Sequence, residues 1–262
     1  MKTSALLEGV RAVVTGATSG LGAAMTDALL KAGARVAMAA RPSSRLEMAV
    51  RTRIENGLSA QAMALDVRDP ASVSSGVEAL LSDWGTVDFV VNNAGIGMRT
   101  VNPQFFTNPQ PFFEVTPEGF SDVIATNLTG YFLVARAFAK IFVQQGYGRI
   151  VNISMNHETM RRQGFIPYGP SRAGAESLSQ IMTEDLRPYN VAVNMLLPGG
   201  ATNTAMIPDT ISDEFRRSLL SPQIMGPPIV FLASPQAEGI TGERIVARDF
   251  DDWLATLPSR QS

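Results

Sequence analysis

The sequence predicts an α/β fold in which a parallel sheet is covered by helices on both faces. Short apolar runs alternate with longer stretches of helical spacing, and the runs stand at 10–14, 34–40, 61–67, 87–92 and 191–197. These runs are mainly apolar instead of alternating between apolar and polar residues, as in parallel strands buried on both faces. No internal repeat, low-complexity segment or linker interrupts the chain, and 262 residues suit one core. We therefore expect a single dinucleotide-binding domain over residues 1–262.

Composition limits the partners and the compartment. The chain has 22 basic and 24 acidic residues, a net charge of −2, so no basic excess favours nucleic acid or an anionic membrane. It has no cysteine, which excludes disulfides and thiolate chemistry. No apolar run approaches the roughly twenty residues that span a bilayer, and a signal peptide has no room before the first run. We expect a cytoplasmic protein with a small-molecule substrate and no metal.

The first apolar run leads into a glycine-rich turn and then a helical pattern over 21–31. The turn reads Gly-x-x-x-Gly-x-Gly, a spacing that lets the backbone turn tightly and bring N–H groups close to a ligand. The free N–H groups of the following helix suit a pyrophosphate. The spacing is one residue wider than the common dinucleotide fingerprint, so a turn without a ligand is the alternative. The expected contacts are Gly16, Thr18, Ser19, Gly20, Leu21 and Gly22.

The helix ends at Gly33, and the apolar run 34–40 is followed by Arg41. In a dinucleotide fold this strand end lies at the adenosine ribose, where an acidic residue binds a free 2′-hydroxyl and an arginine matches a 2′-phosphate. Arg41 therefore favours NADP(H) over NAD, unless it is an ordinary surface arginine. Ser43 and Ser44 are expected to add hydroxyl donors to the phosphate.

The next unit repeats the alternation. An amphipathic stretch over 45–56 precedes the strand 61–67, a helix begins near Pro70, and the strand 87–92 follows. Asp66 and Val67 end the third strand, where they would flank an adenine ring.

At Asn92-Asn93-Ala94-Gly95 the chain resembles the short-chain dehydrogenase/reductase family, in its single-domain branch. The matching pieces follow in order along nearly the whole chain: 15–22, Asp66-Val67, 92–95, Asn127, the strand 148–154, Tyr168 and Pro198-Gly199. The resemblance implies a Rossmann-type, doubly wound sheet of about seven parallel strands. It further implies a nicotinamide cofactor, hydride transfer between a carbonyl and an alcohol, and a homotetramer or dimer assembled through the helices of Asn127 and Tyr168.

The resemblance also extends the cofactor site. It adds Asn93, Ala94 and Gly95 after the fourth strand and Pro198 and Gly199 after the strand 191–197. A threonine shortly after the Pro-Gly pair would contact the nicotinamide carboxamide. Its usual position falls on Asn203, with Thr202 and Thr204 on either side, and the sequence does not choose among them; Thr202 is our assignment.

The catalytic positions depart from the resemblance. The family places a serine thirteen residues before its tyrosine and a lysine four residues after it; here Tyr168 has Met155 and Arg172 at those positions. Ser154 is one position early, so it would serve only if a bulge turned it to the other face. Tyr168 would carry the proton, and Asn127 would support the helix and a proton-relay water.

Each substitution has a physical reading. Arg172 lies one helical turn after Tyr168, keeps a positive charge and can hold the cofactor ribose, but it is bulkier than lysine. Met155 has no donor, and losing an oxyanion donor typically lowers the rate about a hundredfold to a thousandfold. Asn156 or His157 would supply the missing donor instead. The alternative is that His157 is an ordinary surface histidine.

Two further segments are expected at the substrate end. The stretch between Gly95 and Asn127 is longer than the resemblance implies, and its prolines predict a loop. Its four phenylalanines (Phe105, Phe106, Phe112 and Phe113) would line an apolar substrate or pack onto the body or a neighbouring subunit. The apolar segment 206–225 resembles the family's mobile lid.

The sequence thus predicts an NADP(H)-dependent oxidoreductase acting on a small to medium apolar carbonyl or alcohol. The altered positions Met155 and Arg172 keep two alternatives open. One is a nucleotide-binding protein with little redox activity, and the other is a changed reaction such as imine reduction.

Overall fold

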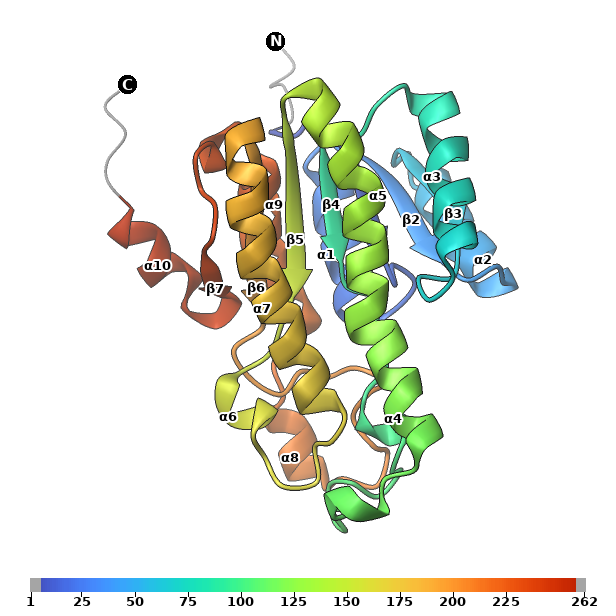
Figure 1. Ribbon diagram of the computed structural model, residues 1–262, viewed down its shortest axis with the longest axis vertical. Helices are drawn as coiled ribbons and strands as arrows, with labels where there is room; N and C mark the ends of the chain where they lie inside the picture. Colours follow the sequence, from blue (N-terminus) through green and yellow to red (C-terminus); the bar gives the residue numbers. More distant parts are fainter. Residues whose placement is uncertain (1–5, 258–262) are drawn as a thin grey trace.

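The computed structural model describes residues 6–257. Within that range seven parallel strands form one sheet in the order β3-β2-β1-β4-β5-β6-β7 (Figure 1). The strands are β1 (Arg11–Thr15), β2 (Arg35–Ala40), β3 (Ala60–Ala64), β4 (Phe89–Asn92), β5 (Gly148–Ile153), β6 (Val191–Leu197) and β7 (Arg244–Val246). The expected Rossmann-type, doubly wound α/β fold is confirmed.

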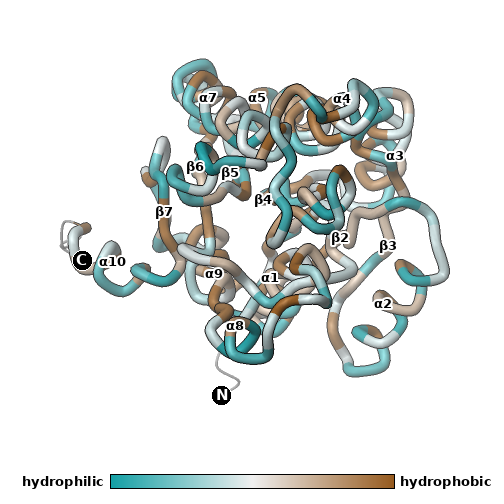
Figure 2. The backbone as a smooth tube through the Cα atoms, turned by 90° about the horizontal axis from the view of Figure 1, so that it is seen from below, coloured by the Kyte–Doolittle hydropathy of each residue, from teal (hydrophilic) through white to brown (hydrophobic). Residues whose placement is uncertain are grey.

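Helices cover both faces of the sheet (Figure 2). One layer holds α1 (Gly20–Lys31), α2 (Ser44–Glu55) and α9 (Gly226–Ala233), and the other holds α3 (Pro70–Trp84), α5 (Gly130–Gln145) and α7 (Tyr168–Leu186). The shorter helices are α4 (Pro117–Ile124), α6 (His157–Met160), α8 (Asp213–Ser218) and α10 (Phe250–Thr256).

Each side of the sheet has its own apolar core because successive strand residues point to opposite faces. In β1, Ala12 and Val14 pack with α1 and α9, whereas Val13 packs with α3 and α5. Every residue of β4 and β5 is buried, which explains why these strands are mainly apolar on both faces. The sequence pattern and the two-sided packing therefore have one cause.

The third strand is shorter than its apolar run suggests. β3 ends at Ala64, because Asp66 turns the chain: its carboxylate accepts from the Arg68 amide at 3.0 Å, and its own N–H donates to Ser72 at 3.0 Å. These bonds replace strand pairing and direct the following residues over the edge of the sheet.

The segment between β4 and α4 is irregular, as its prolines predict. It contains only short 3₁₀ turns, including Met98–Thr100 and Phe112–Glu114, until Thr116 caps α4 by accepting from the Gly119 amide at 3.1 Å. This segment and residues 198–221, which include α8, lie beyond the carboxyl ends of the strands (Figure 1).

The strand order reverses between β1 and β4, since β2 and β3 extend the sheet one way and β5 to β7 the other. In open α/β sheets a ligand crevice forms at such a reversal, outside the carboxyl ends of the strands. None of the helices within residues 6–257 is long and apolar enough to cross a membrane.

Candidate active site

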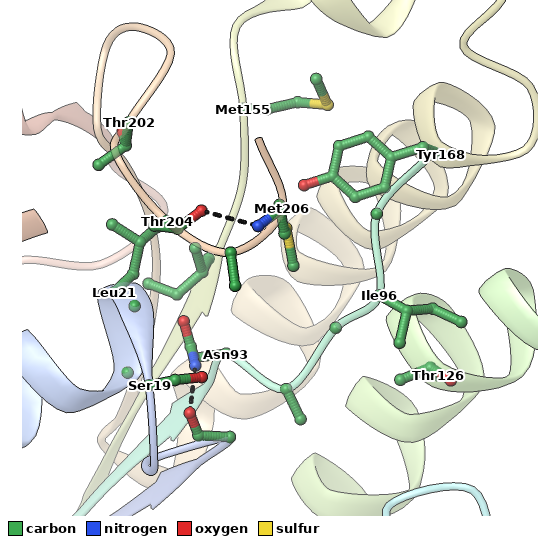
Figure 3. A pocket seen from close by; sticks show the side chains of 18 of the residues that line it. Ser19, Leu21, Asn93, Ile96, Thr126, Met155, Tyr168, Thr202, Thr204 and Met206 are labelled. Carbon is green, nitrogen blue, oxygen red and sulfur yellow. Dashed lines mark hydrogen bonds between the residues drawn. The ribbon is translucent and has the colours of Figure 1, made fainter. Parts of the chain in front are cut away.

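A cavity of about 730 Å³ opens at the point where the strand order reverses. Its walls come from the β1–α1 turn, the ends of β2 to β5, the start of α7 and the segment after β6. Figure 3 shows Ser19 and Leu21 at one end and Met155 with Tyr168 at the other. The cavity is long enough to join the predicted phosphate site to the predicted reacting position.

The phosphate end is shaped by glycines. Gly16 and Gly20 have φ angles of +64° and +55°, in the left-handed region that favours glycine. Gly22 lies so close to the preceding turn that an added Cβ would be 2.2 Å from the Gly16 carbonyl oxygen. The backbone therefore requires glycine here, and α1 begins at Gly20 with its N–H groups directed at the cavity.

Thr15 fastens the 93–95 turn to the end of β1. Its buried hydroxyl donates to the Val91 carbonyl at 3.1 Å and accepts from the amides of Asn93 and Ala94 at 2.9 and 3.0 Å. The Asn93 side chain donates back to the Thr15 carbonyl at 2.8 Å. These bonds hold two sequence-distant motifs against each other at the cavity floor.

The adenosine end carries more positive charge than the sequence indicated. Arg41 lines the cavity, and so does Arg45 from α2. Ser43 does not line it: its hydroxyl caps α2, accepting from the Leu46 amide at 3.3 Å and donating to the Arg41 carbonyl at 3.2 Å. Ser44 is also absent from the lining. The expected serine donors are thus replaced by a second arginine.

Asp66 and Val67 both line the cavity. The Asp66 carboxylate accepts from the Arg68 guanidinium at 2.7 Å, and this bond lowers the pKa of Asp66 more than burial raises it. Asp66 is therefore ionised and neutralises Arg68, so Arg41 and Arg45 are the cations available to an anionic ligand at the adenosine end.

Apart from Ser43, Ser44 and Gly199, the predicted cofactor residues meet in this one cavity. The lining includes Gly16, Thr18, Ser19, Gly20, Leu21, Gly22, Arg41, Asp66, Val67, Asn93, Ala94, Gly95, Tyr168, Arg172, Pro198 and Thr202. Gly199 instead faces β7, where an added Cβ would be 2.7 Å from Val246. Of the three candidates after it, Thr202 and Thr204 line the cavity and Asn203 does not.

Tyr168 is the first residue of α7, and its hydroxyl points into the cavity toward Met206 (Figure 3). Met155 lies beside it and packs with Tyr168 against the buried side chains of Met98, Phe105 and Phe165. The position implied for a serine donor is thus part of an apolar wall.

Arg172 is buried beneath the tyrosine. Its guanidinium carbon lies 5.3 Å from the ring centroids of both Tyr168 and Tyr131, and its Nη1 donates to the Tyr131 hydroxyl at 2.6 Å and the Ile153 carbonyl at 3.0 Å. Its Nε has no partner among the described residues. Burial acts to lower the pKa of Arg172, but its interactions with Tyr131 and Tyr168 outweigh burial and raise the pKa.

Tyr131 is a residue that the sequence did not single out. It is fully buried on α5, and burial raises the pKa of its phenol although Arg172 partly offsets this. The phenol is therefore neutral, accepting from Arg172 while donating to the Ile153 carbonyl at 3.3 Å. The only sequence signal that could have identified Tyr131 as part of the site is its spacing of one helical turn from Asn127.

The Ser154 hydroxyl donates to Glu176 at 2.5 Å, and no bulge re-aims it. Glu176 also binds His157 at 2.9 Å and Arg244 at 2.8 Å. Burial alone would raise the pKa of Glu176, but these three hydrogen bonds outweigh it and hold the pKa below its ordinary value. The hydroxyl of Ser154 would reach a substrate only after leaving Glu176, and His157 is not among the lining residues.

Asn127 is fully buried in a π-helical turn, Ala125–Thr129, between α4 and α5. Its amide accepts from the Ile96 N–H and donates to the Ile96 carbonyl, both at 2.9 Å, and donates to the Ser171 hydroxyl at 3.3 Å. The extra residue of a π turn re-aims the side chain out of the helix, as is frequent at functional sites. Asn127 thereby ties the 93–96 turn to α7.

The four loop phenylalanines divide into two pairs. Phe105 and Phe106 line the cavity, with ring centroids 4.9 Å apart, and Phe105 also contacts Phe165 at 5.7 Å. Phe112 and Phe113 contact each other outside the cavity and are 69% and 73% exposed. Only the first pair forms the expected substrate wall. Among residues 6–257 no group of three or more His, Cys, Asp or Glu side chains could hold a metal.

The sequence of this chain is similar to those of known oxidoreductases. The family described as short chain dehydrogenase matches residues 11–214. The chain belongs to this family. The 3-oxoacyl-(acyl-carrier-protein) reductase of Vibrio cholerae is 32% identical over 91% of this chain and 96% of the relative. Gluconate 5-dehydrogenase of Gluconobacter oxydans is 32% identical over 79% of this chain and 77% of the relative.

Solved structures show the same fold with a nicotinamide cofactor. The 3-ketoacyl-(acyl-carrier-protein) reductase of Brucella melitensis, complexed with NADH, has a TM-score of 0.80 and 32% identity and covers 92% of this chain and 97% of its own. A metagenomic short-chain oxidoreductase in complex with NADP has a TM-score of 0.76 and 28% identity over 92% of this chain and 97% of its own. This short chain dehydrogenase is therefore an NAD(P)-dependent oxidoreductase.

Proposed function

We propose that this enzyme uses NADP(H) to reduce a carbonyl, or oxidise the corresponding alcohol, in a small to medium substrate with an apolar body. The observation that carries the proposal is that the glycine turn, Arg41 and the Tyr168 hydroxyl line one continuous cavity. When bound, the cofactor supplies or accepts the hydride. The residues of the chain bind it, exclude water and move the proton.

The preference for NADPH over NADH rests on charge at the end of β2. Arg41 and Arg45 both line the cavity there. The two carboxylates that line this end, Asp66 and Asp122, both lie within ion-pair distance of Arg68. A 2′-phosphate gains charge-assisted hydrogen bonds from guanidinium groups, whereas a free 2′-hydroxyl needs an acceptor that this end does not offer.

Tyr168 is proposed as the general acid in reduction, because its hydroxyl points into the cavity and the cation of Arg172 below it favours the tyrosinate that remains. Asn127 holds the 93–96 turn against α7 and is proposed to support a proton-relay water. Ser154 stays a candidate donor only if Glu176 releases it.

The donor missing at Met155 is proposed to come from Asn156. Its side chain lines the cavity and has no hydrogen bond to any other residue of 6–257. An amide N–H can stabilise a developing oxyanion as a serine hydroxyl does. This assignment leaves the carbonyl a polar contact next to an otherwise apolar wall.

A cytoplasmic homotetramer or dimer is the proposed assembly. The outer faces of α5 and α7 expose Phe132 at 45% and Ile181 at 57%, which favours a partner on this side of the sheet.

The direct test is turnover. Purified protein with NADPH is expected to reduce members of a panel of aryl and alkyl ketones, aldehydes and imines, followed by the loss of reduced-nicotinamide absorbance. NADH should support the same reaction at a higher KM. A protein that binds NADPH but reduces no member would contradict the proposal and favour a nucleotide-binding role without redox activity.

A further inference from the structure

The substrate end of the cavity is walled by aromatic rings from three separate segments. Phe105 and Phe106 come from the loop after β4, Phe165 from the segment before α7, and Phe215 from α8. The Phe106 and Phe215 rings touch edge to face with centroids 5.3 Å apart, so loop and α8 close on each other. Such a wall suits a flat or branched apolar group and offers few partners to a polyol.

One charged side chain belongs to this wall. Arg162, between α6 and α7, lines the cavity, and its guanidinium carbon lies 5.7 Å from the Phe106 centroid and 5.3 Å from the Phe165 centroid. The guanidinium thus makes cation–π contacts with two rings, and Arg162 is exposed, so its N–H groups are accessible to a ligand.

Arg162 has no acidic partner. Within residues 6–257 no carboxylate lies within ion-pair distance of it. The acidic residues that line the cavity are Asp66 and Asp122, which both lie near Arg68 at the adenosine end. At the aromatic end, the positive charge of Arg162 is therefore not neutralised by any carboxylate within residues 6–257.

We propose that Arg162 binds a carboxylate of the substrate, so that the substrate is an oxo acid, or the matching hydroxy acid, with an apolar body packed on the phenylalanine wall. The guanidinium fork matches a carboxylate with two parallel hydrogen bonds. A single free cation suits a monoanion better than a phosphate dianion, which would need a second positive group. This substrate class rests on the proposed function, because it occupies the same cavity as the proposed cofactor.

Binding tests the proposal independently of turnover. The probe pair is 4-phenylbutanoate and 4-phenylbutanamide, which share a body, differ in charge and have no ketone to reduce. Calorimetry on the NADPH-loaded protein is expected to show the acid binding about tenfold or more tighter than the amide, the effect of one charge-assisted pair. The preference should weaken with added salt.

Arg162→Gln should remove the preference while leaving the affinities for the amide and for NADPH unchanged. Arg161→Gln is the matched control, since Arg161 is an exposed neighbour that does not line the cavity. Equal binding of acid and amide by the parent, absence of acid binding, or a preference that survives Arg162→Gln would each overturn the proposal. Phenylethyl phosphate binding more tightly than the acid would contradict the choice of a carboxylate.

The two proposals fail separately. If no carbonyl compound is reduced but the acid preference depends on Arg162, the redox function is wrong and the anion site stands. If ketones without a carboxylate are reduced as well as matched oxo acids, with Arg162→Gln neutral for both, the redox function stands and the anion site is wrong.

Discussion

The two ends of the cavity are built in different ways. At the phosphate end the contacts come mainly from backbone, in a contiguous turn whose shape depends on Gly16, Gly20 and Gly22. At the reacting end they come from side chains of distant segments, such as Tyr131 on α5 and Arg172 on α7. A backbone cradle keeps its function as long as the glycines remain, whereas a side-chain cluster can be rebuilt residue by residue. The difference would allow the cofactor turn to stay the same while the reacting centre changes.

Two hydrogen-bonded groups underlie the reacting end. Arg172 reaches Tyr131 and Ile153 below the cavity, while Ser154 is held by Glu176 on the next turn of α7. The cation of Arg172 is therefore anchored from below as well as placed under Tyr168. We expect changes at the reacting end to alter turnover and those at the adenosine end to alter cofactor choice.

The largest effect is expected at the tyrosine. Tyr168→Phe keeps the ring that packs with Met155 and Arg172 and removes only the hydroxyl. Turnover should fall by about a hundredfold to ten-thousandfold, the usual contribution of a general acid, with NADPH affinity retained. Steady-state rates and a cofactor titration check both parts. Normal turnover in this variant would show that the proton comes from another group.

At the adenosine end, Arg41→Ala should lower the affinity for NADPH about tenfold or more, because one charge-assisted pair to the 2′-phosphate is lost. The affinity for NADH should stay almost unchanged. Arg51→Ala, on the helix α2 that follows Arg41, serves as the control, since Arg51 is exposed and does not line the cavity. Fluorescence titrations of the parent and both variants measure the affinities for NADPH and NADH. Equal affinities of the parent for the two cofactors would contradict the role of Arg41.

A smaller effect is expected from Tyr131→Phe, which removes the hydroxyl that accepts from Arg172. The Ile153 carbonyl still accepts from the same nitrogen, so the free energy of unfolding should fall by only about 1 to 2 kcal/mol. The loss should be non-additive with Arg172→Lys, since the two residues share one bond. Denaturant unfolding of the double-mutant cycle measures this coupling, and fully additive losses would mean that the pair is not a unit.

The smallest effect is expected at Glu176 and depends on pH. Its folded-state pKa lies below the ordinary value of 4.5, so its ionised form stabilises the fold above that value and the contribution is lost as pH falls through the lower folded pKa. Glu176→Gln should therefore cost about 1 kcal/mol at neutral pH, and the gap to the parent should close in acid. Glu184→Gln, at an exposed pair with Arg187, is the control and should stay near the parent. If the difference in free energy of unfolding between the parent and Glu176→Gln grew as the pH fell, the pKa of Glu176 could not be lowered by folding.

The elements that the sequence predicts well are those with local causes. The glycine turn and the apolar runs depend on neighbouring residues, so the fold and most of the residues that line the cavity could be predicted. The end of β3 was placed too late because the Asp66 turn depends on Ser72, which lies outside the apolar run. Ser43 was misassigned for a related reason, since helix capping competes for its hydroxyl.

The rest depends on contacts between residues far apart in the chain. Tyr131 and Arg172 are 41 positions apart, and nothing in either local pattern indicates that a phenol accepts from the guanidinium. Likewise Arg161 and Arg162 are both exposed arginines, and only the fold shows that the Arg162 guanidinium lies by Phe106 and Phe165 at the cavity. Such pairings need the three-dimensional arrangement.

The most direct measurement compares the parent with the Met155→Ser, Arg172→Lys double variant, using NADPH and a panel of ketones, aldehydes and imines. Our account is that Met155 and Arg172 specialise the site, because the methionine fills an apolar wall and the arginine has its own anchored network. It predicts that the parent reduces at least one class of substrate and that the double variant reduces it more slowly. A parent inactive on every member, with a double variant active on ordinary ketones, would contradict it.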